Sequence, residues 1–153
     1  MSVRVLGIKE TIKELKDLGP DIQKQFRRDV RLIVKPIIDA AKAEYDGENF
    51  PSGTARKWKT KFPLEASKAK SGLRPGITTA KRNRSTILVI QKNAGASVFE
   101  FANTGSLGAA FRQKNGAPPR VIWPSADKQL PQVVEQMTEL IDRVAVMVNR
   151  RIS

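Results

Sequence analysis

Apolar residues recur every three or four positions in three parts of the chain, and this spacing is typical of α-helices that bury one face. It predicts a short helix over residues 9–18, which Gly19 and Pro20 should end, and a long helix over residues 22–41. It also predicts a helix that begins near Asp127, with an apolar stripe of about five turns over residues 130–148. We therefore expect long helices near both ends of the chain.

Pro36 lies inside the second of these patterns. A proline within a helix removes one backbone hydrogen bond and clashes with the preceding turn, at a cost of about 3 kcal/mol. We therefore expect a kink near Leu32 or Ile33, and not two separate helices.

The middle of the chain predicts an arm, a small sheet and a flexible loop. Residues 46–72 hold glycines, prolines, many lysines and scattered aromatic residues, which favours an extended arm. Two or three strands should follow, over residues 73–81, 85–91 and 97–102. The second of these strands contains the run ILVI, so it should be buried on both faces and lie at the centre of the sheet. Residues 103–116 are small or polar and favour a loop that can adapt to a neighbour.

These elements predict an α+β fold in a single domain, residues 1–153. A small antiparallel or mixed β-sheet of three to four strands would pack against the long kinked N-terminal helix and the long C-terminal helix. A chain of 153 residues suits one domain. No apolar run approaches the ~20 residues that span a bilayer, and no secretory signal pattern or cysteine is present. We therefore expect a soluble protein, made in a cytoplasm and without contact with a membrane.

Positive charge is the largest deviation in the composition. The chain holds 28 lysines and arginines against 15 acidic residues, for a net charge of +13. Residues 54–84 alone hold ten basic residues and one acidic residue, Glu65. Such an excess suits an anionic partner, either nucleic acid or an acidic protein surface. The candidate contact residues combine this charge with an interleaved tryptophan, and they are Arg56, Lys57, Trp58, Lys59, Lys61, Lys68, Lys70 and Arg74. A solvated, functionally neutral face is the alternative.

Catalytic chemistry has little support in the sequence. The chain has no histidine and no cysteine, which removes the commonest general base, the thiolate nucleophile and most transition-metal ligands. The glycines after Asn103 do not form a phosphate-binding loop, because no Gly-Lys-Ser/Thr follows them. Glu100 alternates with Phe99 and Phe101, so we expect it to be exposed or in a salt bridge and not catalytic. We therefore predict no catalytic residue, no metal site, no cofactor and no enzymatic activity.

The order of these segments resembles the tail-completion or neck family of long-tailed double-stranded-DNA bacteriophages. The resemblance rests on a Gly-Ile-Lys-Glu N-terminal helix, a basic and apolar long helix, a Pro-Ser-Gly-Thr-Ala-Arg loop and two short motifs before the final helix. In the family, the first motif is an aromatic residue, Glu, an aromatic or small residue and Gly-Thr. The second is Pro-x-Pro-Phe followed by Pro-Ala. The matching positions are Phe99, Glu100, Phe101, Thr104 and Gly105, then Pro118, Pro119, Arg120, Trp123, Pro124 and Ala126.

The resemblance implies a structural virion protein that closes into a ring at the head-tail junction, made in the cytoplasm of a bacterial host. It implies a ring of identical subunits, a hexamer or alternatively a dodecamer. It also implies contacts with the adjoining neck or connector protein and with the tail-tube or tail-terminator protein, and non-specific contact with double-stranded DNA. The alternatives are a tail terminator ring, or a basic nucleic-acid-binding protein outside the virion.

Overall fold

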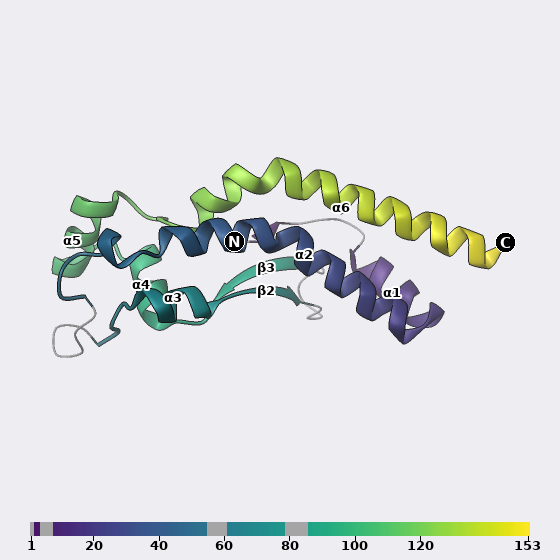
Figure 1. Ribbon diagram of the computed structural model, residues 1–153, viewed down its shortest axis with the longest axis horizontal. Helices are drawn as coiled ribbons and strands as arrows, with labels where there is room; N and C mark the ends of the chain where they lie inside the picture. Colours follow the sequence, from purple (N-terminus) through teal and green to yellow (C-terminus); the bar gives the residue numbers. More distant parts are fainter. Residues whose placement is uncertain (1, 4–7, 55–60, 79–85) are drawn as a thin grey trace. The chain divides into compact units, whose positions relative to one another are not determined.

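The computed structural model describes residues 2–3, 8–54, 61–78 and 86–153. Most of these residues are helical (Figure 1). The helices are α1 (Ile8–Leu18), α2 (Pro20–Glu44), the short 3-10 helix η1 (Gly47–Asn49), α3 (Ala66–Gly72), α4 (Ala94–Phe101), α5 (Gly105–Asn115) and α6 (Ile122–Ile152). The strands are β1 (Ser2–Val3), β2 (Leu73–Thr78) and β3 (Thr86–Gln91).

The predicted α+β fold with a sheet of three to four strands is wrong, because the chain is mainly helical. The sheet consists of two six-residue strands, β2 and β3, and the two-residue β1 pairs antiparallel with β3. Ser2 lies opposite Leu88, and Val3 lies opposite Ile87. The strand order β1-β3-β2 does place the ILVI strand at the centre, as its apolar run indicated.

The expected third strand, residues 97–102, belongs mostly to helix α4. The side chain of Asn93 accepts a hydrogen bond from the backbone N–H of Ala96 and so caps the start of this helix. Ala96, Phe99 and Glu100 are buried at helical spacing, whereas Phe101 is 59% exposed. The apparent alternation over residues 97–102 therefore arises from one exposed aromatic residue at a helix end.

The expected loop, residues 103–116, is mostly helix α5. Phe111 and Gly108 are buried on one face of it. A Cβ atom on Gly108 would lie 2.6 Å from the backbone carbon of Asn103, so this glycine permits a close approach of the chain. Gly108 therefore serves packing, and residues 105–115 form a helix where a loop was expected.

The chain divides into two compact units. The terminal unit comprises Met1–Pro36, Pro75–Leu88 and Gln129–Ser153, and the central unit comprises Ile37–Arg74 and Val89–Lys128. Four elements, α2, β2, β3 and α6, contribute residues to both units. The assignment of residues 1–153 to one domain stays a prediction, because the units share these continuous elements.

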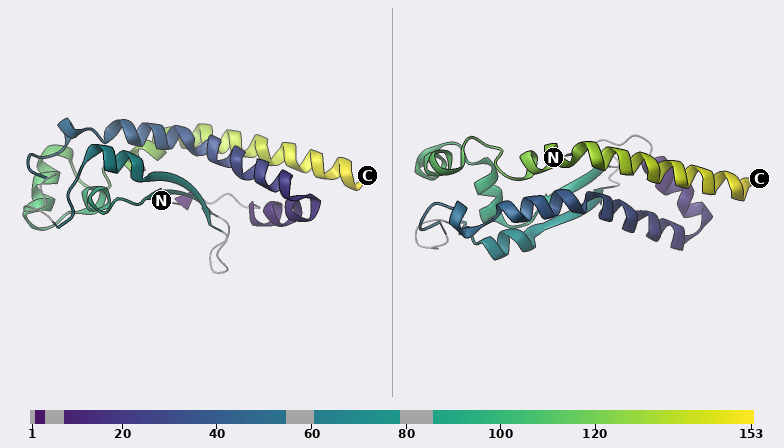
Figure 2. Two further views of the ribbon diagram at one scale, coloured as in Figure 1. Left: turned by 60° about the horizontal axis from the view of Figure 1, so that its bottom comes forward. Right: turned by 45° about the horizontal axis from the view of Figure 1, so that its top comes forward.

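The terminal unit contains an antiparallel pair of long helices, the first half of α2 and the second half of α6, which lie side by side (Figures 1 and 2). The predicted apolar stripes of both helices are confirmed, except at Val134 of α6, which is 46% exposed. Their buried residues are Phe26, Val30, Ile33 and Val34 in α2, and Val133, Met137, Leu140 and Val144 in α6. Helix α2 runs through Pro36 as one element, as expected, while the kink stays a prediction.

The central unit is built around an aromatic cluster of Tyr45, Phe50, Phe99 and Phe111. The ring centroids of Phe99 and Phe111 are 5.0 Å apart at 88°, and those of Phe50 and Phe99 are 5.2 Å apart at 63°. Such edge-to-face pairs add about 0.5–1.5 kcal/mol each beyond their buried area. Phe50 and Phe111 come from the segments predicted as arm and loop, and the described part of residues 46–72 also contributes Leu64 and Ala69 to this core. These segments are thus part of the packed unit.

Candidate functional site

Glu100 binds the first turn of helix α6 from helix α4. Its two carboxylate oxygens accept hydrogen bonds from the backbone N–H groups of Val121 and Ile122, each at 3.0 Å. These N–H groups lie where α6 begins, and the first N–H groups of a helix have no acceptor within the helix. A carboxylate is also favoured there by the helix dipole. Glu100 therefore caps a helix that begins more than twenty residues further along the chain.

Arg120 performs the converse role at the end of helix α4. Its guanidinium donates hydrogen bonds to the carbonyl oxygens of Phe99 and Ala102, and to that of Gly116 at 3.0 Å. The last carbonyl groups of a helix also lack intrahelical partners. The guanidinium carbon lies 5.7 Å from the ring centre of Phe99 and 5.5 Å from that of Phe111. Arg120 therefore ties the end of α4 to the aromatic cluster.

Glu100 and Arg120 form what we call the capping pair, in which each residue satisfies the helix end that the other residue's segment leaves open. Burial lowers the pKa of Arg120, and the negative charge of Glu100 opposes this effect. The pair fastens residues 116–121, the strap that connects α5 to α6, onto helix α4. It therefore brings the two sequence motifs into direct contact.

The expectation that Glu100 is exposed or in a salt bridge is wrong. Its exposed fraction is 0%, and its carboxylate is held by backbone N–H groups. Burial raises the pKa of Glu100, and the hydrogen bonds from the backbone of Val121 and Ile122 partly offset this rise. Both oxygens are engaged and shielded from solvent, so this carboxylate suits a structural role and not proton transfer to a substrate.

The raised pKa of Glu100 predicts a pH dependence of stability. The folded protein holds the proton of the Glu100 carboxyl more tightly than the unfolded chain does. The contribution of this proton to the free energy of unfolding is therefore complete below the ordinary pKa of 4.5, and it is lost as pH rises through the raised pKa of the folded state. The free energy of unfolding of the wild type, minus that of Glu100→Gln, should therefore fall as pH rises from 4.5. Urea denaturation of both proteins at a series of pH values measures this difference. A difference that is constant or increases with pH would contradict the prediction.

The other motif residues flank the capping pair in sequence. Phe101 and Trp123 are 59% and 39% exposed, next in sequence to Glu100 and Ile122 respectively. Thr104 lies at the N-cap of α5 without a side-chain capping bond, and Gly105 follows with a φ of 73°, a value that favours glycine. The remaining positions are exposed Pro119 and Pro124, half-buried Pro118, and buried Ala126.

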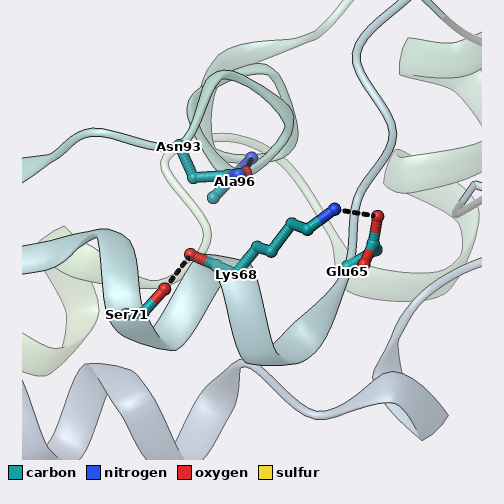
Figure 3. Close-up of polar contacts among 5 residues, drawn as sticks. All are labelled: Glu65, Lys68, Ser71, Asn93 and Ala96. Carbon is teal, nitrogen blue, oxygen red and sulfur yellow. Dashed lines mark hydrogen bonds and ion pairs between the residues drawn. The ribbon is translucent and has the colours of Figure 1, made fainter.

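The structure describes only half of the predicted basic contact residues. Arg56, Lys57, Trp58 and Lys59 lie outside the described residues, and Lys61, Lys68, Lys70 and Arg74 are exposed. The Lys68 ammonium contacts the Glu65 carboxylate at 2.8 Å, and Figure 3 shows this side chain extended along α3 toward Glu65. Lys61 lies with its ammonium 5.6 Å from the ring centre of Phe62. That these eight residues form one contact surface stays a prediction.

Two residues that the sequence reasoning missed hold α5 in place. The Lys114 ammonium donates to the carbonyl oxygens of Glu48 and Phe50, at 2.6 and 2.8 Å. The Asn115 amide donates to the carbonyl oxygen of Asn49 at 2.6 Å. The partners are 64 to 66 residues apart in sequence, and no local pattern signals such contacts.

Within the part of the chain that the structure describes, no three or more acidic side chains gather in a way that could hold a metal ion. No helix among these residues combines the length and hydrophobicity of a membrane-spanning segment. Comparisons with models of protein families, with curated proteins and with solved structures found no match.

Proposed function

We propose that this protein is a structural component of a long-tailed bacteriophage particle. It acts at the junction of head and tail as a ring-forming neck or tail-completion protein, and joins the tail to the DNA-filled head. In this role the protein works through its surfaces and has no catalytic turnover. The supporting observation is the capping pair, because Glu100 belongs to the first sequence motif and Arg120 to the second.

The capping pair gives the two motifs a common physical purpose. Without it, the strap would leave α6 uncapped and the end of α4 open. With it, the exposed aromatic residues Phe101 and Trp123 are held beside the strap on ordered backbone. Ordered, partly exposed aromatic side chains are common anchors of protein interfaces. This arrangement suits a protein whose task is assembly.

The net charge of +13 suits the same role, because the DNA passing through the junction and acidic rims of adjoining proteins are both anionic. A tail terminator ring would use the same features. A nucleic-acid-binding protein outside the virion is the second candidate, and the net charge is the observation that favours it. The two roles differ in where the protein resides after infection.

Deletion of the gene from its phage tests the proposal. We expect DNA-filled heads and separate tails, or tails with malformed ends, and a loss of infectious particles. Electron microscopy of lysates and a plaque assay measure these outcomes, and the gene supplied from a plasmid should restore joining. Normal infectious particles that lack the protein would refute the proposal. Steeply salt-dependent duplex binding, together with absence from purified virions, would favour the second candidate.

A further inference from the structure

Two exposed stripes of opposite charge follow the two long helices of the terminal unit. On α2, basic residues recur at spacings of four and three, and on α6 acidic residues recur at the same spacings. Residues at these spacings share one face of a helix. The basic stripe is Lys24, Arg28 and Arg31, and the acidic stripe is Glu135, Glu139 and Asp142.

Neither stripe is paired with opposite charges among the residues that the structure describes. All six side chains are exposed, and none forms an ion pair with another of the residues that the structure describes. An unpaired acidic stripe is unexpected on a chain whose net charge is +13, since the basic residues are almost twice as numerous. Two complementary charged faces are therefore presented by the same molecule.

Apolar side chains accompany the stripes. Leu32 is 59% exposed and follows Arg31 on α2, where it lines a groove that Gln136 and Glu139 of α6 also line. Val146 is 51% exposed and continues the acidic stripe four residues beyond Asp142. Each stripe thus has apolar surface beside its charges, as the core of a protein interface requires.

We propose that the acidic stripe of α6 in one copy of this protein docks against the basic stripe of α2 in a second copy. The equal spacing lets three ion pairs form along about two helical turns. The occupant is a second copy because both complementary faces belong to one chain, so the same contact can repeat from subunit to subunit. Repeated head to tail, such a contact closes into a ring or grows as a filament.

The closure of this contact into a ring rests on the proposed function. The contact between two copies is inferred from the two stripes alone. The net charge of each copy opposes association at long range, but salt at 0.15 M screens charges separated by more than about 8 Å. Charges in direct contact are screened much less. The stripes can therefore select partner and orientation despite the overall repulsion.

Sedimentation velocity of the full chain over a range of concentrations tests the proposal. We expect the wild type to associate. Reversal of the basic stripe (Lys24→Glu, Arg28→Glu, Arg31→Glu) or of the acidic stripe (Glu135→Lys, Glu139→Lys, Asp142→Lys) should raise the dissociation constant at least about tenfold, since like charges then face each other. The chain carrying both reversals should associate again, because the stripes are complementary once more. The two single-stripe variants should also associate with each other when mixed.

A matched control reverses three exposed basic residues elsewhere in the terminal unit, Lys13, Lys16 and Arg150, to glutamate. This control changes the net charge as much as the basic-stripe variant does, and it should associate within about twofold of the wild type. Circular dichroism checks the fold of every variant, and glutamine replacements of the same residues substitute for any variant that unfolds. A wild type that stays monomeric at all concentrations, or reversals without effect on association, would overturn the inference. So would a monomeric wild type whose duplex binding is lost in the basic-stripe variant.

The outcome is distinguishable from failure of the proposed function. Stripe-dependent association of a protein that is absent from virions refutes the phage role alone. A protein that joins heads to tails normally with either stripe reversed refutes the stripe contact alone.

Discussion

Replacement of Glu100 by alanine should lower the free energy of unfolding by about 2–6 kcal/mol. The substitution leaves the N–H groups of Val121 and Ile122 without their acceptor, and each buried unsatisfied polar group costs about 1–3 kcal/mol. Both groups are close to the start of α6, so the lost hydrogen bonds are those that hold the first turn of this helix. We therefore expect this single substitution to remove a large part of the stability of a typical domain.

Urea denaturation followed by tryptophan fluorescence measures the effect. The chain has two tryptophans, and in a Trp58→Phe background only Trp123, in the first turn of α6, reports. The matched control is Glu44→Ala, which removes the same carboxylate from an exposed position in the same central unit. The free energy of unfolding of this control should stay within about 0.5 kcal/mol of that of the wild type. Equal stabilities of the two variants would show that Glu100 does not cap α6.

A double-mutant cycle tests whether the capping pair acts as one unit. Arg120→Ala alone should also destabilise, because the carbonyl oxygens of Phe99 and Ala102 lose their donor. Once either residue is gone, the strap is less tightly held, and the second substitution should cost less than it does alone. Residues in one hydrogen-bonded network commonly show such coupling, of about 0.5–3 kcal/mol.

The long helices were predictable because each buries a stripe several turns long. Phe26, Val30 and Ile33 in α2, and Met137 and Leu140 in α6, repeat the helical spacing often enough to exclude a strand. The central strand was predictable for a similar reason, since a run of β-branched and leucine residues suits a strand with neighbours on both sides. In these elements the local pattern and the packing agree.

The short helices α4 and α5 were not predictable from local pattern. Helix α4 is only two turns long, and exposed Phe101 gives its end the alternation of a strand. Its start depends on the side chain of Asn93, and α5 depends on contacts of Lys114 and Asn115 with residues 48–50. The fold class was mistaken because contacts distant in sequence hold α5, and because the strand-like alternation over residues 97–102 outweighed the local cap at Asn93 that starts α4.

The sequence indicated the residues of the candidate site but not the hydrogen bonds that they form. The two motifs indicated Glu100 and Arg120, yet nothing in the sequence showed that one segment caps the other. A glutamate between two phenylalanines resembles the exposed face of a strand, whereas in the structure it is fully buried. The cause is the helical path of α4, which turns Glu100 inward beside Phe99 and leaves Phe101 outside.

Replacement of Gly95 by alanine should also destabilise the central unit, by up to about 2 kcal/mol. Helix propensity alone favours alanine over glycine by about 1 kcal/mol, so the expected sign depends on packing. A Cβ atom at this position of α4 would lie 2.2 Å from the carbonyl oxygen of Pro63 and 2.9 Å from its carbon. These are backbone atoms, so relief requires the segment before α3 to move away from α4, and overpacking of this kind commonly costs about 1–3 kcal/mol.

The control for this prediction is Gly47→Ala, in the short 3-10 helix of the same unit. Nothing lies within 4 Å of a Cβ atom built there, and its backbone does not require glycine. Its free energy of unfolding should therefore match that of the wild type within about 0.5 kcal/mol. Urea denaturation of both variants measures the comparison. Gly95→Ala as stable as Gly47→Ala would mean that α4 and Pro63 are not in close contact in solution.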